Sequence, residues 1–332
     1  MKTKTTNGNL DTTLNLKQEK VASRAGFGLG LLKAAQLNSN IVGLCADLTE
    51  STQMHIFANA FSDRFFEVGV AEQNLVTVAS GLAAMGKIPF ASSYAAFAPG
   101  RCWEQIRTTI CLNNVPVKIV GSHAGLSVGP DGATHQILED IALMRALPNM
   151  VVLSPGDANE AKAATLALAN DSRPGYIRLA REATEQFRPD HHEFKIGEVI
   201  KLNDGQDVTI ISTGVITVES IEAAARLKAD GISVDLLHCP SLKPIDQREI
   251  IASAKKTGVV ITVEEHQIAG GLGSIVTEIL SEFYPTPVYR IGIEDEFGQS
   301  GTYEELKLNY GLNSTNIIIK TKEFLLSSKS HN

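Results

Sequence analysis

Cysteine is scarce in this sequence, and its arrangement excludes two classes of protein. Four cysteines occur among 332 residues, and they form no Cys-x-x-Cys pair and no close cluster with histidine: Cys45, Cys102, Cys111 and Cys239. We therefore expect neither a disulfide-stabilised secreted domain nor a structural zinc site. Reduced thiols of this kind are typical of a cytoplasmic protein, and a cytoplasmic location is our expectation.

Excess positive charge and long apolar runs are also missing. The chain has 30 Lys and Arg residues against 37 Asp and Glu, a formal net charge of -7 at pH 7. Binding to nucleic acid would require a basic face. No apolar run approaches the length of a membrane-spanning helix, and the opening segment MKTKTTNGNLDTTLNLKQEK lacks the pattern of a secretion signal. We expect no nucleic-acid partner and no membrane partner.

What the sequence does contain is an alternation of apolar strand-like runs with helical patterns. Its hydrophobic content of 43% and charged content of 20% are those of a globular protein, and its length predicts about two domains. In the first half we expect strands at 40–46, 64–68, 88–93, 115–121, 149–154 and 175–180, with helices at 72–86, 102–112, 137–147 and 158–170. This order predicts βαβ units around a doubly wound, mostly parallel sheet.

The alternation breaks over residues 182–207, which are charged and contain an Asp-Gly turn signal near their end. We interpret this segment as a linker, partly structured at GEVIKL. A second alternation follows, with expected strands at 208–213, 232–238, 258–264 and 287–293 and helices near 216–229, 246–255 and 271–283. The predicted organisation is a polar tail (1–18), a first α/β domain (19–185), and a linker with a second α/β domain (186–332).

Lysine and arginine are absent between Arg64 and Lys87, and Glu72 stands in this stretch where a short apolar run meets a long helical pattern. Burying an unpaired carboxylate is costly, so this group either stays neutral or finds a partner from elsewhere. The simpler interpretation is an acidic residue that favours the helix N-terminus. This segment alone leaves both interpretations open.

The loop GSHAGLSVGPDGATHQ (121–136) is the second candidate for chemistry. It follows an expected strand, and ligand sites of open parallel sheets lie beyond the carboxyl ends of their strands. Its glycines permit turns and close approach of a ligand, while His123, Asp131 and His135 supply hydrogen-bonding groups. Two histidines and an aspartate in one glycine-rich loop favour a functional role over a structural one.

Aromatic residues gather in PFASSYAAFAPGRCWEQIR (89–107). These rings are either core residues or, beside small Ala and Ser residues, a stacking wall for a planar heterocycle.

Two other patterns carry no site. GFGLG (26–30) does not follow a strand, so we reject a dinucleotide loop. Glu264, Glu265 and His266 are adjacent on one expected strand and point to opposite faces, which argues against a metal site, and GGLG (270–273) is expected to let a helix start close to the sheet.

The segments EVGVAEQN, PFASSYAAF and SHAGLSVGPDGATHQ together resemble the pyrimidine-binding domain of transketolases. The resemblance continues through residues 182–332 as the C-terminal domain of that family. It implies thiamine diphosphate as cofactor, with the Glu72 carboxyl at N1′ of its aminopyrimidine ring. In that case the partner of Glu72 is a ligand. Tyr94 and Phe97, with Phe90 behind them, match the rings that pack on the pyrimidine, and Asp47 matches a position bordering the cofactor.

The same resemblance implies a site for a phosphorylated sugar. Its matching positions are Arg24, Ser51, His123, Asp131, His135 and Arg181. The two histidines match catalytic residues that contact the hydroxyls and carbonyl oxygen of the donor sugar, and Asp131 matches the residue that contacts a donor hydroxyl. Arg24, Ser51 and Arg181 match positions that hold the phosphate, for which paired guanidiniums are well suited.

Two departures from the family pattern are visible. AAFAPGR is one residue longer than the pattern, which leaves open which ring stacks on the pyrimidine. The chain also contains no Gly-Asp-Gly with a downstream Asn, the signature that binds the diphosphate and Mg²⁺ or Ca²⁺. The resemblance thus implies the C-terminal subunit of a split transketolase, completed by an N-terminal subunit in an α₂β₂ heterotetramer. Its reaction would be transfer of a two-carbon unit between sugar phosphates of the pentose phosphate pathway, such as xylulose 5-phosphate and ribose 5-phosphate.

Three alternatives remain. A fragment of a 1-deoxyxylulose-5-phosphate synthase would share the AEQ and DGxTHQ motifs, but we expect no histidine there at the position of His123. The β subunit of a 2-oxoacid dehydrogenase E1 would share AEQ but not DGATHQ, and its substrate requires no phosphate-binding arginines. A non-catalytic partner subunit with a decayed site is the third, and the intact set of candidate residues argues against it.

Overall fold

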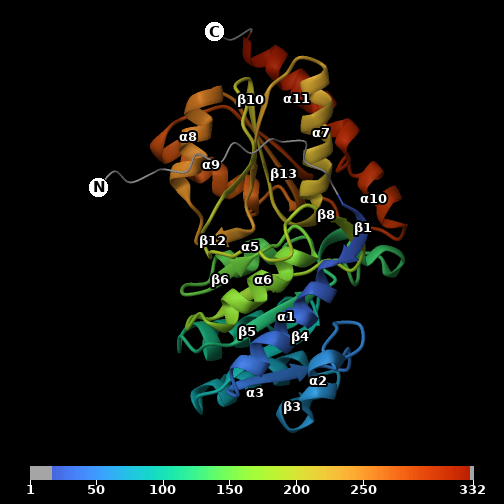
Figure 1. The fold of residues 1–332 in the computed structure, drawn as a ribbon, viewed down its shortest axis with the longest axis vertical. Helices are drawn as coiled ribbons and strands as arrows, with labels where there is room; N and C mark the ends of the chain where they lie inside the picture. Colours follow the sequence, from blue (N-terminus) through green and yellow to red (C-terminus); the bar gives the residue numbers. More distant parts are fainter. Residues whose placement is uncertain (1–16, 330–332) are drawn as a thin grey trace.

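The computed structural model describes residues 17–329, so residues 1–16 of the predicted tail lie outside the described residues. The described chain forms two α/β units, one built mainly from the first half of the sequence and one from the second (Figure 1). A short antiparallel ribbon of β1 (Lys17–Ala22) and β8 (Ala183–Gln186) connects the start of the first unit to its end. No helix in this range is long and apolar enough to cross a membrane.

The first unit contains a seven-stranded sheet in the order β12-β6-β7-β5-β4-β2-β3, parallel except for β12. The strands are β2 (Ile41–Cys45), β3 (Phe65–Glu67), β4 (Ile88–Tyr94), β5 (Lys118–Ser122), β6 (Val151–Leu153), β7 (Gly175–Arg178) and β12 (Ser241–Lys243). The six strands expected from the sequence are present. The edge strand β12 comes from the second half of the chain and was not predicted.

Helices cover both faces of this sheet, as a doubly wound fold requires. On one face lie α1 (Ser23–Leu37), α2 (His55–Ala60) and α6 (Ala158–Ala169), which share a core with Phe90 and Ile177. On the other lie α3 (Glu72–Ala84), α4 (Trp103–Gln105), the π-helix η3 (Ile106–Cys111) and α5 (Asp140–Arg145). GFGLG lies inside α1, which confirms that it is not a dinucleotide loop.

The second unit contains a five-stranded sheet in the order β14-β13-β10-β11-β9, parallel except for β9. Its strands are β9 (Ile200–Asn203), β10 (Val208–Ser212), β11 (Val234–His238), β13 (Val260–Gln267) and β14 (Val288–Ile293). Its helices are α7 (Thr217–Ala229), α8 (Gln247–Thr257), α9 (Leu272–Phe283), α10 (Tyr303–Asn309) and α11 (Ser314–Lys329). The fold class predicted from the sequence is confirmed. The segment 182–207, expected to be partly structured at GEVIKL, contains β9 there and also the unpredicted β8.

Buried polar groups join the two units. Asp140, at the start of α5, accepts hydrogen bonds from Tyr176 Oη (2.6 Å) and Arg178 Nε (2.9 Å), and Arg178 Nη2 donates to the carbonyl oxygen of Glu265 on β13 (2.8 Å). On the opposite side of the junction, Glu160 Oε2 lies 2.7 Å from His238 Nε2, and both side chains are fully buried. These contacts fix the second unit against the first.

Candidate functional site

The candidate residues occupy the loops beyond the carboxyl ends of five parallel strands of the first sheet. Asp47 and Ser51 follow β2, Glu72 follows β3, Tyr94 ends β4, and the loop 123–135 follows β5. Arg181 follows β7, and Arg24 reaches the same edge from the first turn of α1, where its side chain meets the backbone of both Ser51 and Arg181. This is the edge at which ligands bind in open parallel sheets.

Glu72 is the first residue of α3, and its side chain is 1% exposed. Its carboxylate accepts hydrogen bonds from Ser93 Oγ (3.4 Å) and from Arg101 Nη1 (3.1 Å). The resemblance implies a ligand as the partner of this carboxyl, and that assignment stays a prediction. In the structure Arg101, from the segment after β4, pairs with it.

A wall of aromatic and imidazole rings extends from the site of Glu72. Tyr94 stacks on His123 with ring centroids 3.8 Å apart, and on Phe97 at 5.9 Å. His135 meets Phe97 edge-on at 5.3 Å, and the guanidinium of Arg101 lies 4.3 Å over the centre of the Phe97 ring. Two side chains from the glycine-rich loop, one from the end of β4 and two from the segment after β4 are therefore joined by ring contacts.

Phe90 does not belong to this wall. Its side chain is fully buried and packs on Phe27 of α1, with ring centroids 6.4 Å apart. The ring lies in the core between the sheet and α1, and its support of a stacked cofactor stays a prediction. Trp103, the fourth ring of the cluster, donates from Nε1 to the carbonyl oxygen of Leu143 (2.9 Å) and packs against the core on the other face of the sheet.

His123 is held in an unusual conformation. Its φ angle is 57°, in the left-handed region that few residues other than glycine adopt, and its side chain is buried. Ser122 Oγ lies 2.8 Å from His123 Nδ1. Burial, followed by the positive charges of Arg24 and Arg181, lowers the pKa of His123 to about 3. Near neutral pH this imidazole is thus uncharged, so it offers a substrate one donor and one acceptor rather than a positive charge.

The two arginines converge beside His123. Arg24 donates from Nη1 to the carbonyl oxygen of Ser51 (2.6 Å) and from Nε to that of Arg181 (3.2 Å), while Arg181 Nη1 donates to the carbonyl oxygen of Val128. Burial and the charge of Arg181 lower the pKa of Arg24 from its usual value. Two cations held this close together form a site for an anion such as a phosphate.

Three of the predicted site residues, Asp47, Ser51 and Asp131, are not part of the group of rings and arginines described above. Ser51 contributes its carbonyl oxygen to Arg24. Asp47 and Asp131 have exposed side chains at the rim, and the backbone N–H of Asp47 is held by Glu67 Oε1 at 2.7 Å. Glu67, like Arg101, was missed by the sequence analysis. The signal for Arg101 was present, because a buried carboxyl without a neighbouring cation requires a partner from a distant segment.

The buried acids of β13 are paired with backbone N–H groups. Glu264 accepts from the N–H groups of Leu272 (2.7 Å) and Gly273 (2.8 Å) at the start of α9, whereas Glu265 points to the opposite face and accepts from Ser127 N (3.0 Å). Glu264 and Glu265 thus point to opposite faces, as expected, and GGLG lies at the start of α9 beside β13. Among residues 17–329 no cluster of three or more His, Cys, Asp or Glu side chains is arranged to hold a metal ion.

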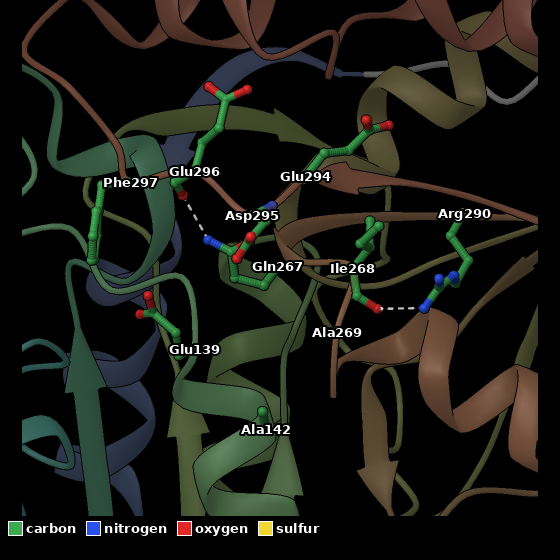
Figure 2. Close-up of a pocket in the computed structure, with 10 residues that line it drawn as sticks. All are labelled: Glu139, Ala142, Gln267, Ile268, Ala269, Arg290, Glu294, Asp295, Glu296 and Phe297. Atoms are coloured by element: carbon green, nitrogen blue, oxygen red, sulfur yellow. Dashed lines mark hydrogen bonds between the residues drawn. The ribbon is translucent and has the colours of Figure 1, made fainter.

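A cavity of about 560 Å³ lies at the junction of the two units (Figure 2). Its wall includes Glu139 before α5, Arg290 on β14 and the acidic loop 294–296, with Gln267 Nε2 donating to the carbonyl oxygen of Glu296 (2.7 Å). None of the site residues predicted from the sequence lines this cavity. It is therefore separate from the candidate site at the sheet edge.

The described site fits the ring of a thiamine cofactor. Glu72 supplies a buried carboxylate, and Phe97 offers a face that already stacks on a planar cation, the guanidinium of Arg101. The arrangement provides what a flat heterocycle with N–H groups requires.

Comparison with known proteins agrees with the architecture. Residues 19–186 match the family model "Transketolase, pyrimidine binding domain", and residues 197–317 match "Transketolase, C-terminal domain". A protein of Methanocaldococcus jannaschii named as a transketolase C-terminal section is 45% identical over 90% of this chain and 95% of its own length. One subunit of the apulose-4-phosphate transketolase of Phocaeicola vulgatus is 37% identical over 92% of this chain and 98% of its own length.

Two further matches place the chain within the family. A 1-deoxy-D-xylulose-5-phosphate synthase of Syntrophotalea carbinolica is 37% identical over 90% of this chain, but the match spans 47% of that enzyme. A solved structure described as "Split gene transketolase, inactive beta4 tetramer" superposes with a TM-score of 0.86 and 44% identity, covering 92% of this chain and 99% of the other. This chain therefore belongs to the transketolase family, as the C-terminal subunit of a split transketolase.

Proposed function

We propose that this chain forms, with a separate N-terminal subunit, a thiamine-diphosphate-dependent transferase that moves a two-carbon ketol unit from a ketose phosphate to an aldose phosphate. Xylulose 5-phosphate and ribose 5-phosphate are the proposed substrates, and the cytoplasm is the proposed location. The observation that carries the proposal is the meeting of Glu72, the Tyr94–Phe97 wall, His123 and the arginine pair at one sheet edge.

Each group has a distinct role in this proposal. Thiamine diphosphate, when bound, supplies a nucleophilic carbon and an electron sink for cleavage of the bond between the second and third carbons of the ketose. Glu72 holds a proton at the ring nitrogen of the aminopyrimidine, and Phe97 and Tyr94 support the ring. His123 and His135 bind the oxygens of the donor sugar, and Asp131 contacts one of its hydroxyls from the rim.

The arginine pair holds the far end of the sugar. Burial, and after it the positive charge of Arg181, lowers the pKa of Arg24, and a phosphate between the two guanidiniums would offset both effects. Fixing the phosphate positions the reacting carbon of the sugar beside the rings. Asp47 and Ser51 border this region on the loop after β2.

The diphosphate and its metal ion are assigned to the partner. The sequence carries no Gly-Asp-Gly…Asn signature, and we propose that an N-terminal subunit with this signature supplies the site for the diphosphate and Mg²⁺ or Ca²⁺ in an α₂β₂ assembly. The similar solved structure is an inactive assembly of four β chains, which supports the requirement for a second kind of subunit.

The test is a reconstitution assay. We would measure two-carbon transfer from xylulose 5-phosphate to ribose 5-phosphate, with thiamine diphosphate and Mg²⁺, for this chain alone, the N-terminal subunit alone and the mixture. We expect activity in the mixture and no activity in either subunit alone. A complex that binds the cofactor without this activity would contradict the proposed sugars and direct the search to other donors. Failure to form a complex or to bind cofactor would support the non-catalytic alternative.

Replacing Arg181 by alanine should raise the KM for phosphorylated sugars at least about tenfold with a small change in kcat. A charge-assisted hydrogen bond is worth about 1.5–3 kcal/mol, and binding of a remote phosphate contributes mostly equally to ground and transition states. Initial rates with xylulose 5-phosphate give the result, and unphosphorylated xylulose is the internal control. An unchanged KM for the phosphate ester would remove Arg181 from the site.

A further inference from the structure

Arg101 contacts both groups that the proposed function assigns to the aminopyrimidine ring. Its Nη1 lies 3.1 Å from Glu72 Oε2, and its guanidinium carbon lies 4.3 Å from the centre of the Phe97 ring. The carboxylate of Glu72 is 1% exposed, whereas the side chain of Arg101 is 48% exposed. A half-exposed cation therefore lies against a carboxylate that, with this cation in place, is almost out of contact with water.

A guanidinium has the chemistry of the ring that it would meet there. It is planar, it stacks on aromatic faces, and its N–H groups donate to carboxylates. An aminopyrimidine that stacks on Phe97 and donates to Glu72 would use the same face and the same oxygen. The guanidinium of Arg101 and the aminopyrimidine ring thus compete for the same position between Glu72 and Phe97.

We propose that Arg101 is a displaceable occupant of the coenzyme's ring site, which keeps Glu72 paired in the unassembled chain and moves away when thiamine diphosphate binds. This inference rests on the proposed function, because it takes Glu72 and Phe97 as the groups that bind the ring. Without Arg101, the Glu72 carboxylate would keep the hydrogen bond from Ser93 Oγ (3.4 Å) but would lose its positively charged partner, which is costly.

The backbone around Arg101 is anchored, so the movement is one of the side chain. Its N–H donates to the carbonyl oxygen of Phe97 (3.1 Å), and its own carbonyl oxygen accepts from Gln73 Nε2 (3.4 Å). The exposed half of the side chain gives the guanidinium a path to solvent. Arg101 is the last residue of the segment AAFAPGR, which is one residue longer than the pattern expected for the family.

While Arg101 occupies the ring site, the coenzyme can bind only to the fraction of molecules in which this site is free. The apparent affinity for the coenzyme is reduced in proportion to that fraction. Replacing Arg101 by glutamine removes the competing cation and keeps a polar side chain of similar length. The apparent dissociation constant of thiamine diphosphate in the assembled complex should therefore fall about fivefold. Arg107→Gln removes an exposed positive charge from the π-helix η3 and is the matched control.

The experiment is a calorimetric titration of thiamine diphosphate, with Mg²⁺, into the two-subunit complex carrying wild-type, Arg101→Gln or Arg107→Gln chains. Tighter binding by Arg101→Gln alone is the expected result. Equal or weaker binding by that variant would overturn the inference and would mean that Arg101 stays on Glu72 in the loaded site. Urea unfolding of the free chain gives a second readout, in which Arg101→Gln should lower the midpoint relative to both other chains.

Arg101→Lys decides the outcome if the glutamine variant does not fold. Lysine keeps the charge beside Glu72 but cannot stack as a plane on Phe97, so it leaves the ring face free. The Arg101→Lys variant should therefore bind the coenzyme more tightly than wild type. Binding equal to wild type or weaker would overturn the inference. If wild type and Arg107→Gln assemble with the partner but take up no coenzyme, the proposed function fails and the inference with it. If they bind it normally and neither Arg101 variant binds tighter, the inference alone is wrong.

Discussion

Replacing Glu72 by glutamine should lower kcat of the reconstituted enzyme at least about a thousandfold and leave the chain folded. The amide has nearly the same shape as the carboxyl, but it cannot exchange a proton with a ring nitrogen, and proton transfer by a positioned side chain typically contributes 10²- to 10⁴-fold. The measurement is kcat at saturating thiamine diphosphate, together with circular dichroism of the variant.

Glu104→Gln is the matched control for this prediction. Glu104 lies on α4 with an exposed side chain, so its replacement makes the same chemical change outside the site. Its kcat should stay within about twofold of wild type. If Glu72→Gln kept a tenth or more of the wild-type rate, Glu72 would have no role in proton transfer, and the assignment of the ring site would fail with it.

Replacing Asp140 by asparagine should lower the free energy of unfolding by about 3–5 kcal/mol, the range measured when one partner of a buried ion pair is removed. Asp140 is fully buried, and Arg178 is 7% exposed. Although burial disfavours the charged guanidinium, Asp140 and then Glu265 hold the pKa of Arg178 above its usual value. Without Asp140, Arg178 would remain as a buried charge without its carboxylate at the junction of the two units.

Urea unfolding of the chain measures this effect. Glu222→Gln is the comparison variant, because Glu222 pairs with Arg226 on the exposed face of α7, at 3.8 Å and with both side chains about half exposed. That exposed pair should contribute less than about 1 kcal/mol. Equal losses for the two variants would show that the Asp140–Arg178 pair has no special weight at the junction.

The apolar strands expected from the sequence are present, whereas β1, β8, β12 and the helix α1 were not predicted. The apolar runs of both sheets are long and bounded by turn residues, so their type could be predicted from local pattern. In α1 the glycines Gly26, Gly28 and Gly30 lower the helix propensity. The structure explains Gly26, because a Cβ there would lie 1.9 Å from the carbonyl oxygen of Ala158 on α6. The same residue that weakens the local helix signal lets the two helices pack closely.

The site was predicted in part for a comparable reason. The rule that ligands bind beyond the carboxyl ends of parallel strands places the loops after β2 to β7 together, and the structure brings His123, Tyr94 and the arginines into contact. The pairing of Glu72 with Arg101 joins residues 29 positions apart, and no local pattern specifies such a pair. Phe90 and Tyr94 share a face of β4, and the sequence does not show that α1 covers the first of them.

The edge strand β12 has a consequence for biosynthesis. Because residues 241–243 complete the seven-stranded sheet, the first unit remains unfinished on the ribosome until β9, β10 and β11 of the second unit have emerged. Until then β6 presents an open edge, the kind of surface on which nascent chains aggregate. Shortening the gene to the first unit alone would make that transient exposure permanent.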